Sequence, residues 1–302
     1  MGRFTEQSQI LCIVNSRAHA KALFDAIGDL DGAIHLSTLM CPLHRRAVLQ
    51  SVRERLAAQR PVRLVATSLI EAGVDVDFPE VWRAAAGLDS IAQAAGRCNR
   101  EGRRDAGRVV VFEPAVAKAP RALQAFWQAT RPVIRAHDDL LGLEAVRAYF
   151  QELYWQKGEA ALDATTIDGR VGVLAAIRER SREFAFPFRT IAEAFRLIDD
   201  VMEPVIVPWR GDPGEQEAAH TLRRVSAMQR PLGRDLRRLQ QYTVSIPKRS
   251  RDAWLAMGAL RPLHPALGDN LLCFDDLAHY REATGLDIAD LGQRSAESNM
   301  IG

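Results

Sequence analysis

The sequence has 302 residues, of which 47% are hydrophobic, and its formal net charge is +2. This length suggests about two domains, and the apolar content supports a sizeable core, which excludes a disordered chain. Lys occurs at only four positions among the 40 basic residues. An arginine bias is compatible with nucleotide or nucleic-acid binding, because guanidinium forms bidentate hydrogen bonds with phosphate, but GC-rich codon usage produces the same bias.

Strand and helix patterns alternate from residue 9 to residue 113. The predicted strands are 9–15, 33–38, 62–68, 80–86 and 107–113. The predicted helices are 18–28, 42–59 and 89–100, with Pro42 opening the second and Asp89 as a candidate cap of the third. Strands that are joined by helical crossovers indicate a parallel α/β sheet.

The pattern changes after Pro114. We expect helix over 118–157, with aromatic residues on one face, and mixed structure over 171–200. Strands are predicted at 203–209, 242–247 and 271–274, helices at 215–228 and 252–258, and a turn at 211–215. The chain is therefore expected to divide into an α/β domain (1–115), a helical linker (116–160) and an α+β C-terminal domain (161–302).

The four cysteines, at positions 12, 41, 98 and 273, show no metal-ligand spacing. This pattern favours reduced thiols in a cytoplasmic protein. No apolar run approaches the roughly 20 residues of a membrane span, and the first residues lack the pattern of a signal peptide. The sequence predicts no metal ligands and no contact with membranes.

Three segments follow strand ends in the α/β domain, namely 15–17, 67–78 and the helix containing 93–100. In an open α/β sheet such segments form the ligand crevice. Gln93, Arg97 and Arg100 are spaced i, i+4 and i+7, which predicts one stripe on a helix. Two guanidinium groups and an amide suit a polyphosphate whose charge builds during transfer, although a solvated basic face has the same spacing.

Four blocks together resemble motifs of superfamily 2 helicases. CIVNSRAHAKALF resembles motif IV, VATSLIEAGVDVDFPEVW motif V, and GLDSIAQAAGRCNREGR motif VI, while HLSTLMCPLHRRAVLQSVRERL is similar to the segment between the first two. The sequences of these blocks are similar to those of the CRISPR-associated helicase-nuclease of type I systems. The similarity is to the second RecA-like lobe and the C-terminal accessory domain of that family. The resemblance is firm over 9–113 and looser over 114–290.

This resemblance implies roles for individual residues. Arg97 and Arg100 would contact the γ-phosphate of ATP as arginine fingers, and Gln93 would lie near the nucleotide. Gly73 and Asp75 would belong to the loop that joins nucleotide to nucleic acid. Ser16, Arg17, Thr67 and Ser68 would contact the DNA backbone. Capping of a following helix is the alternative for Ser16, Thr67 and Ser68.

The sequence departs from the complete family pattern. It contains no GxxxxGK[ST] motif and no Asp-Glu dipeptide, so the phosphate loop and the Mg²⁺ ligands are expected on a first lobe outside these residues. His137-Asp138 is the one His-Asp pair, and we expect it on a helix surface rather than in an HD nuclease site. The first lobe and the HD nuclease domain are therefore expected partners.

A second candidate site lies in residues 222–251, which carry nine basic residues and one acidic residue. Arg234, Arg237 and Arg238 are candidate contacts to single-stranded DNA, with Tyr242 and Trp254 as candidate stacking platforms. The alternatives for this stretch are a solvated face and a docking surface for the first lobe.

The resulting hypothesis is the C-terminal portion of an ATP-driven translocase that acts on single-stranded DNA in CRISPR defence. Expected partners also include the RNA-guided surveillance complex and an anti-CRISPR inhibitor. Two alternatives remain open: a lobe of another superfamily 2 helicase that acts on DNA or RNA, and a non-enzymatic module that binds a partner or an inhibitor. ATP hydrolysis by the chain alone is not expected, because the phosphate loop is absent from the sequence.

Overall fold

The computed structural model describes residues 2–115, 120–158, 161, 163–181, 183–194, 202–211, 215–275 and 277–288. These residues form two compact units: Met1–Leu123 together with Met202–Gly302, and Gln124–Val201. The division expected at residues 115 and 160 stays a prediction. Residues 212–214 of the expected turn lie outside the described residues. So do residues 195–200, at the end of the segment that was expected to have mixed structure.

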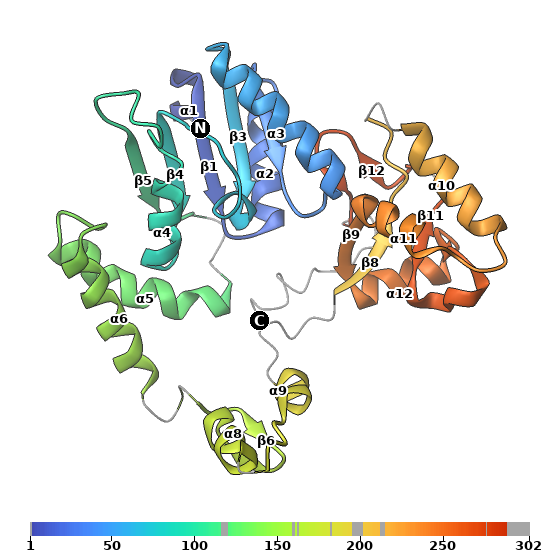
Figure 1. The fold of residues 1–302 in the computed structure, drawn as a ribbon. Coiled ribbons are helices and arrows are strands. Elements are labelled where there is room, and N and C mark those ends of the chain that lie inside the picture. Colours follow the sequence, from blue (N-terminus) through green and yellow to red (C-terminus); the bar gives the residue numbers. More distant parts are fainter. Residues whose placement is uncertain are drawn as a thin grey trace. The chain divides into compact units, whose positions relative to one another are not determined.

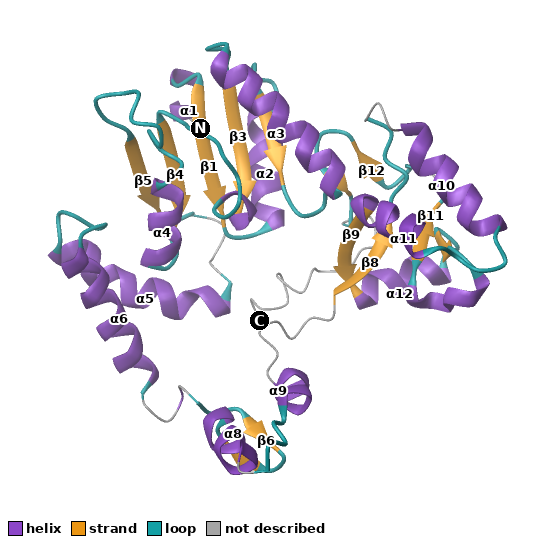
Figure 2. Cartoon of the chain, viewed as in Figure 1, coloured by secondary structure: helices purple, strands orange, loops and turns teal. Residues whose placement is uncertain are grey.

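A five-stranded parallel sheet forms the centre of the first unit (Figures 1 and 2), as the sequence predicts. Its strand order is β2-β3-β1-β4-β5. The strands are β1 (Gln9–Val14), β2 (Ala33–Leu36), β3 (Val62–Thr67), β4 (Glu80–Ala84) and β5 (Arg108–Phe112). β1 and β3 are buried along their whole length, as expected for central strands that are covered on both faces.

Helices cover both faces of this sheet. The core against one face includes Val52 from α3 (Pro42–Ala57) and Ala94 from α4 (Leu88–Ala95). The core against the other face includes Phe4 from α1 (Gly2–Glu6) and Ile27 from α2 (Arg17–Ile27). This doubly wound arrangement directs the loops at the carboxyl ends of the strands to one edge, where ligands of such sheets bind.

The helix predicted over 89–100 is wrong beyond Ala95. Gly96 forms the C-cap of α4, and residues 97–102 continue as turns in which Asn99 (φ 46°) and Gly102 (φ 62°) adopt left-handed conformations. The cap assignment is also wrong, because Gly87 occupies the N-cap and Asp89 lies in the first turn. A carboxylate in that turn still interacts favourably with the helix dipole.

The C-terminal part of the first unit contains a second, four-stranded sheet of order β10-β11-β8-β9. Its strands are β8 (Met202–Ile206), β9 (Thr243–Pro247), β10 (Leu260–Pro262) and β11 (Leu272–Phe274). Its helices are α10 (Glu215–Ala227), α11 (Gly233–Leu239) and α12 (Lys248–Ala256). A hairpin of β12 (Tyr280–Arg281) and β13 (Gly285–Leu286) follows. The short elements α11, β10, β12 and β13 were not expected from the sequence.

The hairpin β12–β13 packs on the loop that precedes α3. The Leu286 N–H donates to the Leu39 carbonyl over 2.8 Å. The Tyr280 hydroxyl accepts from the Cys41 N–H and lies 2.8 Å from His44 Nδ1, and the His44 ring stacks on Trp209. Polar and aromatic contacts therefore fasten the C-terminal part to the α/β lobe within one unit.

The second unit contains α6 (Leu143–Lys157), α8 (Val173–Ser181), α9 (Phe188–Ala194) and most of α5 (Arg121–Ala136). A small hairpin of β6 (Thr166–Ile167) and β7 (Arg170–Val171) accompanies them. The aromatic residues of α6 do not share one face, since Tyr149 is buried and Trp155 is exposed. The expectation of a single aromatic face is therefore wrong. His137 and Asp138 lie just past the end of α5.

Candidate nucleotide and nucleic-acid site

The first two loops of the predicted crevice start side by side. Val14 at the end of β1 is in register with Thr67 at the end of β3, so the segments that begin at Asn15 and Ser68 leave the same edge of the sheet. Thr67 is buried and Ser68 is exposed. Ser16 caps α2 by accepting a hydrogen bond from the His19 N–H. The capping alternative therefore describes the Ser16 side chain in this structure, and its contact with DNA stays a prediction.

The loop after β3 passes over α3 on its way to β4. Gly73 is exposed with φ 69°, a left-handed conformation that glycine adopts without strain. Two residues later, the Asp75 carbonyl accepts from Arg53 Nε of α3 over 2.8 Å. Arg53, Asp75 and Arg103 contribute to the lining of a cavity of about 460 Å³. This lining mixes both charge signs and so does not by itself select an anion.

The three residues of the predicted stripe have different environments. Gln93 is exposed near the end of α4. Arg97 is 6% exposed, and its guanidinium donates from Nε to the Ile70 carbonyl (3.0 Å) and from Nη2 to the Glu71 carbonyl (2.5 Å). Burial lowers the pKa of Arg97, and the neighbouring positive charge of Arg100 adds to this effect. Arg97 thus fastens the loop after β3 to the end of α4.

Of the two arginines in the predicted stripe, Arg100 is the one with an exposed guanidinium. Its side chain is 44% exposed, and its Nε lies 3.1 Å from Asp75 Oδ1, on a side chain that is itself 74% exposed. An ion pair between two exposed groups contributes little to stability. The Arg100 guanidinium can therefore exchange this partner for another anion at low cost.

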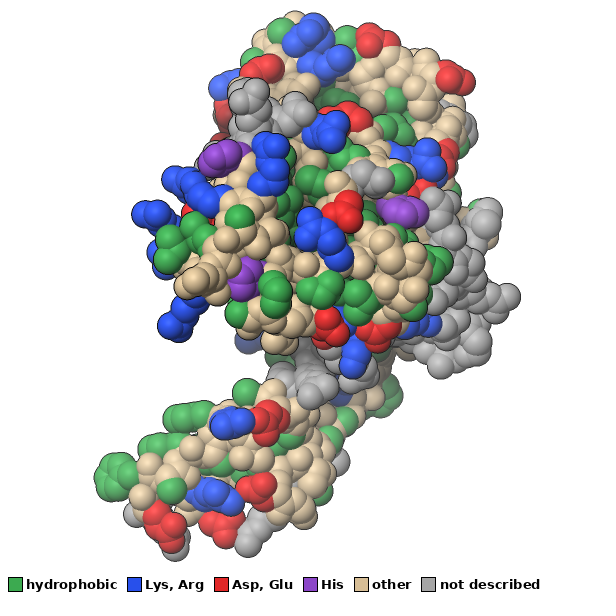
Figure 3. All heavy atoms as spheres, turned by 90° about the vertical axis from the view of Figure 1, so that its right-hand side faces the viewer, with side chains coloured by type: hydrophobic (Ala, Val, Ile, Leu, Met, Phe, Trp, Pro, Cys, Tyr) green, Lys and Arg blue, Asp and Glu red, His purple; other side chains and the backbone are tan. Residues whose placement is uncertain are grey.

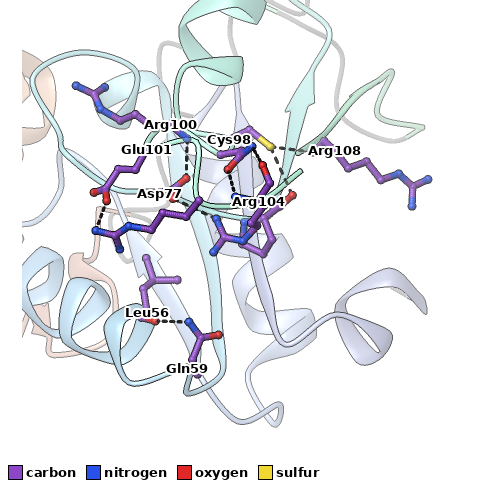
Figure 4. Close-up of polar contacts among 11 residues, drawn as sticks. Leu56, Gln59, Asp77, Cys98, Arg100, Glu101, Arg104 and Arg108 are labelled. Atoms are coloured by element: carbon purple, nitrogen blue, oxygen red, sulfur yellow. Dashed lines mark hydrogen bonds and ion pairs between the residues drawn. The ribbon is translucent and has the colours of Figure 1, made fainter. Parts of the chain in front are cut away.

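The turn that carries Arg100 is held by side chains from a distant segment (Figure 4). Asp77 Oδ1 accepts from the Arg100 N–H over 2.7 Å, and Asp77 Oδ2 lies 3.1 Å from Arg104 Nη1. The Asn99 side chain bonds both the N–H and the carbonyl of Arg104. The Phe78 N–H also donates to the Arg97 carbonyl. Residues 97–104 are therefore pinned to the segment that precedes β4.

A buried ion pair lies beneath these loops. Arg83 of β4 and Glu71 are 2% and 6% exposed, and Arg83 Nε lies 2.7 Å from Glu71 Oε1. Arg83 Nη1 also donates to Asn15 Oδ1 over 2.6 Å. Burial raises the pKa of the Glu71 carboxyl even though Arg83 lies beside it. Burial likewise lowers the pKa of Arg83.

The sequence predicts no individual site role for Asn15, Glu71, Asp77, Arg83 or Arg104. One signal was available for Arg83, which interrupts the apolar strand 80–86 with a charge. A charged residue in a buried strand requires a partner, and Glu71 was a candidate. Asp77 and Arg104 carry no comparable signal, because their contact spans 27 positions and depends on how the turn closes.

Some of the residues in and beside the basic stretch 222–251 that were predicted to contact DNA are buried. Tyr242 and Trp254 are buried in the core of the C-terminal part, so their prediction as stacking platforms is wrong. The reason is that their rings supply apolar area to the second sheet. Arg224 forms an ion pair with the fully buried Asp235. Arg234, Arg237 and Arg238 are exposed on α11, and Lys and Arg side chains project from the face of this part in Figure 3.

Among the described residues, no group of three His, Cys, Asp or Glu side chains is arranged to hold a metal ion. Over the same residues, no helix combines the length and the apolar character needed to cross a membrane. All four cysteines are free thiols.

The parallel sheet, with two polar loops leaving its carboxyl edge, has the fold of a RecA-like lobe. The arginine-bearing turn lies instead beside the segment that precedes β4. Residues 6–103 match the sequence family described as "CRISPR-associated nuclease/helicase Cas3, C-terminal". A curated Cas3 of Haloferax volcanii is 45% identical over 73 residues, which are 24% of this chain and 8% of that protein.

Solved structures of T. fusca Cas3 share the fold over a longer range. The AMPPNP complex matches with a TM-score of 0.55 and 15% identity, covering 90% of this chain and 36% of that one. The ATP complex matches with a TM-score of 0.53 and 16% identity, covering 94% and 38%. The family match is confined to residues 6–103, and the chain spans well under half the length of these relatives.

Proposed function

We propose that this chain is the second lobe and C-terminal region of an ATP-dependent translocase on single-stranded DNA, acting in type I CRISPR defence. The match to Cas3 over residues 6–103 supports this class of reaction. The DNA would be the strand displaced by an RNA-guided surveillance complex, and the setting would be the cytoplasm. The nucleotide would be shared with a first lobe that carries the phosphate loop. We refer to the first lobe and this chain together as the two-lobe enzyme.

The single observation that carries the proposal is the exposed Arg100 guanidinium on a pinned turn. Its pairing with the exposed Asp75 is weak, so the γ-phosphate of ATP can replace that carboxylate. A guanidinium at this position stabilises the charge that builds on the transferred phosphoryl group. The fixed main chain of Arg100, bonded to Asp77, limits the reorganisation that the contact requires.

Arg97 and Gln93 complete the proposed nucleotide contacts. Two nitrogens of Arg97 already donate to main-chain carbonyls, so its phosphate contact falls to the remaining nitrogen of the guanidinium. Gln93 is exposed and free to orient toward the nucleotide. The ligands that would hold Mg²⁺ are expected on the first lobe, since this sequence has no Asp-Glu dipeptide, and the ion would supply charge neutralisation for the phosphates.

The test compares ATP hydrolysis by the two-lobe enzyme and by this chain alone, each with and without single-stranded DNA. We expect single-stranded DNA to stimulate ATP turnover by the two-lobe enzyme. We expect none from the chain alone, because one arginine-bearing lobe cannot hold the β-phosphate. Turnover by the purified chain above a mock preparation, or a two-lobe enzyme that ignores DNA, contradicts the proposal. RNA-stimulated turnover in place of DNA-stimulated turnover favours another superfamily 2 helicase.

A further inference from the structure

The Arg83–Glu71 ion pair is an unusual feature of this lobe. Its two side chains are 2% and 6% exposed, and their charged atoms are 2.7 Å apart. Neither Arg83 Nε nor Glu71 Oε1 has a partner of hydrogen-bonding geometry among the described residues. Removing two charges from water is so unfavourable that an apolar pair of similar volume is often at least as stable. Fold stability therefore gives a poor account of this pair.

The pair lies in the middle of a chain of contacts between the two halves of the candidate site. On one side, Arg83 Nη1 donates to Asn15 Oδ1, and Asn15 Nδ2 donates to the Ala85 carbonyl over 2.7 Å. Asn15 immediately precedes Ser16 and Arg17, the expected DNA contacts. The adjacent strand β3 ends at Thr67, four residues before Glu71.

On the other side, the pair is continuous with the arginine-bearing turn. The Glu71 carbonyl accepts from Arg97 Nη2, and the Ile70 carbonyl accepts from Arg97 Nε. The Arg97 carbonyl in turn accepts from the Phe78 N–H, next to the Asp77 that bonds Arg100. The contacts thus run without interruption from the end of β1 to the turn that carries Arg100.

We propose that Arg83 and Glu71 are positioning residues through which bound single-stranded DNA controls the placement of Arg97 and Arg100. The inference rests on the proposed function, since it assumes that DNA binds at the loops and ATP at the arginine-bearing turn. The physical reason is that Arg83 and Glu71 must stay together, because separating them would leave a buried charge unpaired, which is strongly unfavourable. A displacement of the Asn15 loop by DNA is therefore followed by Glu71, and through Glu71 by Arg97.

A matched control lies at the other end of the same strand. Arg3 Nη2 of α1 and Glu80 Oε2 of β4 form an ion pair at 2.6 Å. Glu80 also accepts from Trp82 Nε1. This pair fastens α1 to the sheet at the amino end of β4, away from the segments that begin at Asn15 and Ser68. Its removal tests whether loss of any ion pair on β4 has the same effect.

The experiment measures ATP turnover by the two-lobe enzyme with and without single-stranded DNA. The first variant carries Arg83→Met with Glu71→Met, and the control carries Arg3→Met with Glu80→Met. We expect the first variant to lose most DNA stimulation, about 10-fold or more, which is a typical coupling between two sites. The loss should appear in kcat more than in KM for ATP, because the arginines act on the transferred phosphoryl. The control should keep its stimulation.

A second variant keeps the test decisive if the double methionine variant does not fold by circular dichroism. Asn15→Ala leaves the ion pair intact and removes its link toward the DNA loop, so it should weaken stimulation in the same direction. Normal stimulation in folded variants of both kinds overturns the inference and leaves the proposed function standing. A parent two-lobe enzyme without DNA-stimulated turnover overturns the proposed function, and the inference with it.

Discussion

The main-chain N–H of Arg100 donates a hydrogen bond to Asp77 Oδ1, with nitrogen and oxygen 2.7 Å apart. The other oxygen of the same carboxylate lies 3.1 Å from Arg104 Nη1. One side chain thus fixes both the main chain that presents Arg100 and the segment that follows it. Arg104, which sequence alone suggests is a surface residue, belongs to the support of the proposed arginine finger.

Arg100→Ala should reduce kcat of the two-lobe enzyme by about 10³-fold, because the variant loses the charge that stabilises the transferred phosphoryl. Arg103→Ala is the matched control, since its side chain is 72% exposed and pairs with the nearby Glu101. That control should retain near-parental turnover. Steady-state ATPase assays measure both, and circular dichroism checks the fold. Equal turnover in the two variants would mean that Arg100 is a solvated residue.

Asp77→Ala should reduce kcat by about 10- to 100-fold, because a small displacement of a catalytic group has an effect of this size. Asp77→Asn keeps an oxygen acceptor for the Arg100 N–H and loses only the charge facing Arg104, so it should retain more activity. Hydrogen exchange of the Arg100 amide in this chain reports the same bond without any ATPase assay. Unchanged protection of that amide in Asp77→Ala would contradict the assigned support.

The sheet and the order of its loops were predictable because they follow from local signals. Residues 10–14 of the buried strand β1 form a continuous apolar run, and parallel strands place their carboxyl ends at one edge. The end of α4 was not predictable from the same signals. Arg97 fits a helical spacing, but its guanidinium donates to carbonyls of Ile70 and Glu71, 26 or more positions away. These long-range bonds override the local periodicity.

The C-terminal part shows the same limit from another direction. The run of basic residues at 222–251 indicates an exposed face, and Arg237 is indeed exposed. Asp235 within that run is fully buried and pairs with Arg224, while Tyr242 packs into the core. Composition reports the average character of a segment, whereas burial of each side chain depends on the sheet onto which the segment folds.

Reversing Arg237 and Arg238 to Glu tests the predicted contact of α11 with DNA. If these exposed side chains contact phosphates, the affinity of this chain for single-stranded DNA should fall for every sequence, because backbone contacts carry no base information. The slope of log affinity against log salt should also flatten, by about 0.7 for each phosphate that is no longer neutralised. The matched control reverses Arg131 and Arg135, two exposed arginines of α5, and changes the net charge equally.

The docking alternative makes a different prediction for the same variant. The DNA affinity of the chain would remain at the parental value, and association with a separately prepared first lobe would weaken. Measuring both affinities on one preparation separates the two. Equal losses of DNA affinity in the α11 variant and the α5 control would indicate a general charge effect and remove α11 from the DNA path.

Gly285→Ala should destabilise the attachment of the C-terminal part to the lobe. Gly285 has φ 81°, and a Cβ there would lie 2.4 Å from the Leu39 carbonyl oxygen. Gly258→Ala is the control, because its φ of 75° carries the same backbone strain while a Cβ would meet no atom within 4 Å. We expect Gly258→Ala to cost about 1 kcal/mol and Gly285→Ala at least about 2 kcal/mol. Urea unfolding measures both, and equal losses would contradict the close approach.

The buried His35 predicts how stability depends on pH. Burial lowers the pKa of His35 from the usual 6.5 to about 4, and neither ring nitrogen has a hydrogen-bond partner among the described residues. The unfolded chain therefore binds a proton at a higher pH than the folded protein does. Above about pH 6.5 this difference in proton binding does not change the free energy of unfolding. As the pH falls toward 4, it lowers the free energy of unfolding progressively. His44, whose pKa burial also lowers, acts in the same direction.

Replacing His35 isolates its share of this pH dependence. His35→Leu removes the titrating group from a buried position, so the loss of stability between about pH 7.5 and about pH 5 should shrink by on the order of 1–2 kcal/mol. His220→Leu, at an exposed position, serves as the control for removing one histidine. Urea midpoints at the two pH values measure the difference, and carboxylates that titrate in both proteins cancel in the comparison. A pH dependence in His35→Leu equal to that of the parent would show that His35 is protonated equally in the folded and unfolded chains, which is incompatible with its burial as a neutral ring.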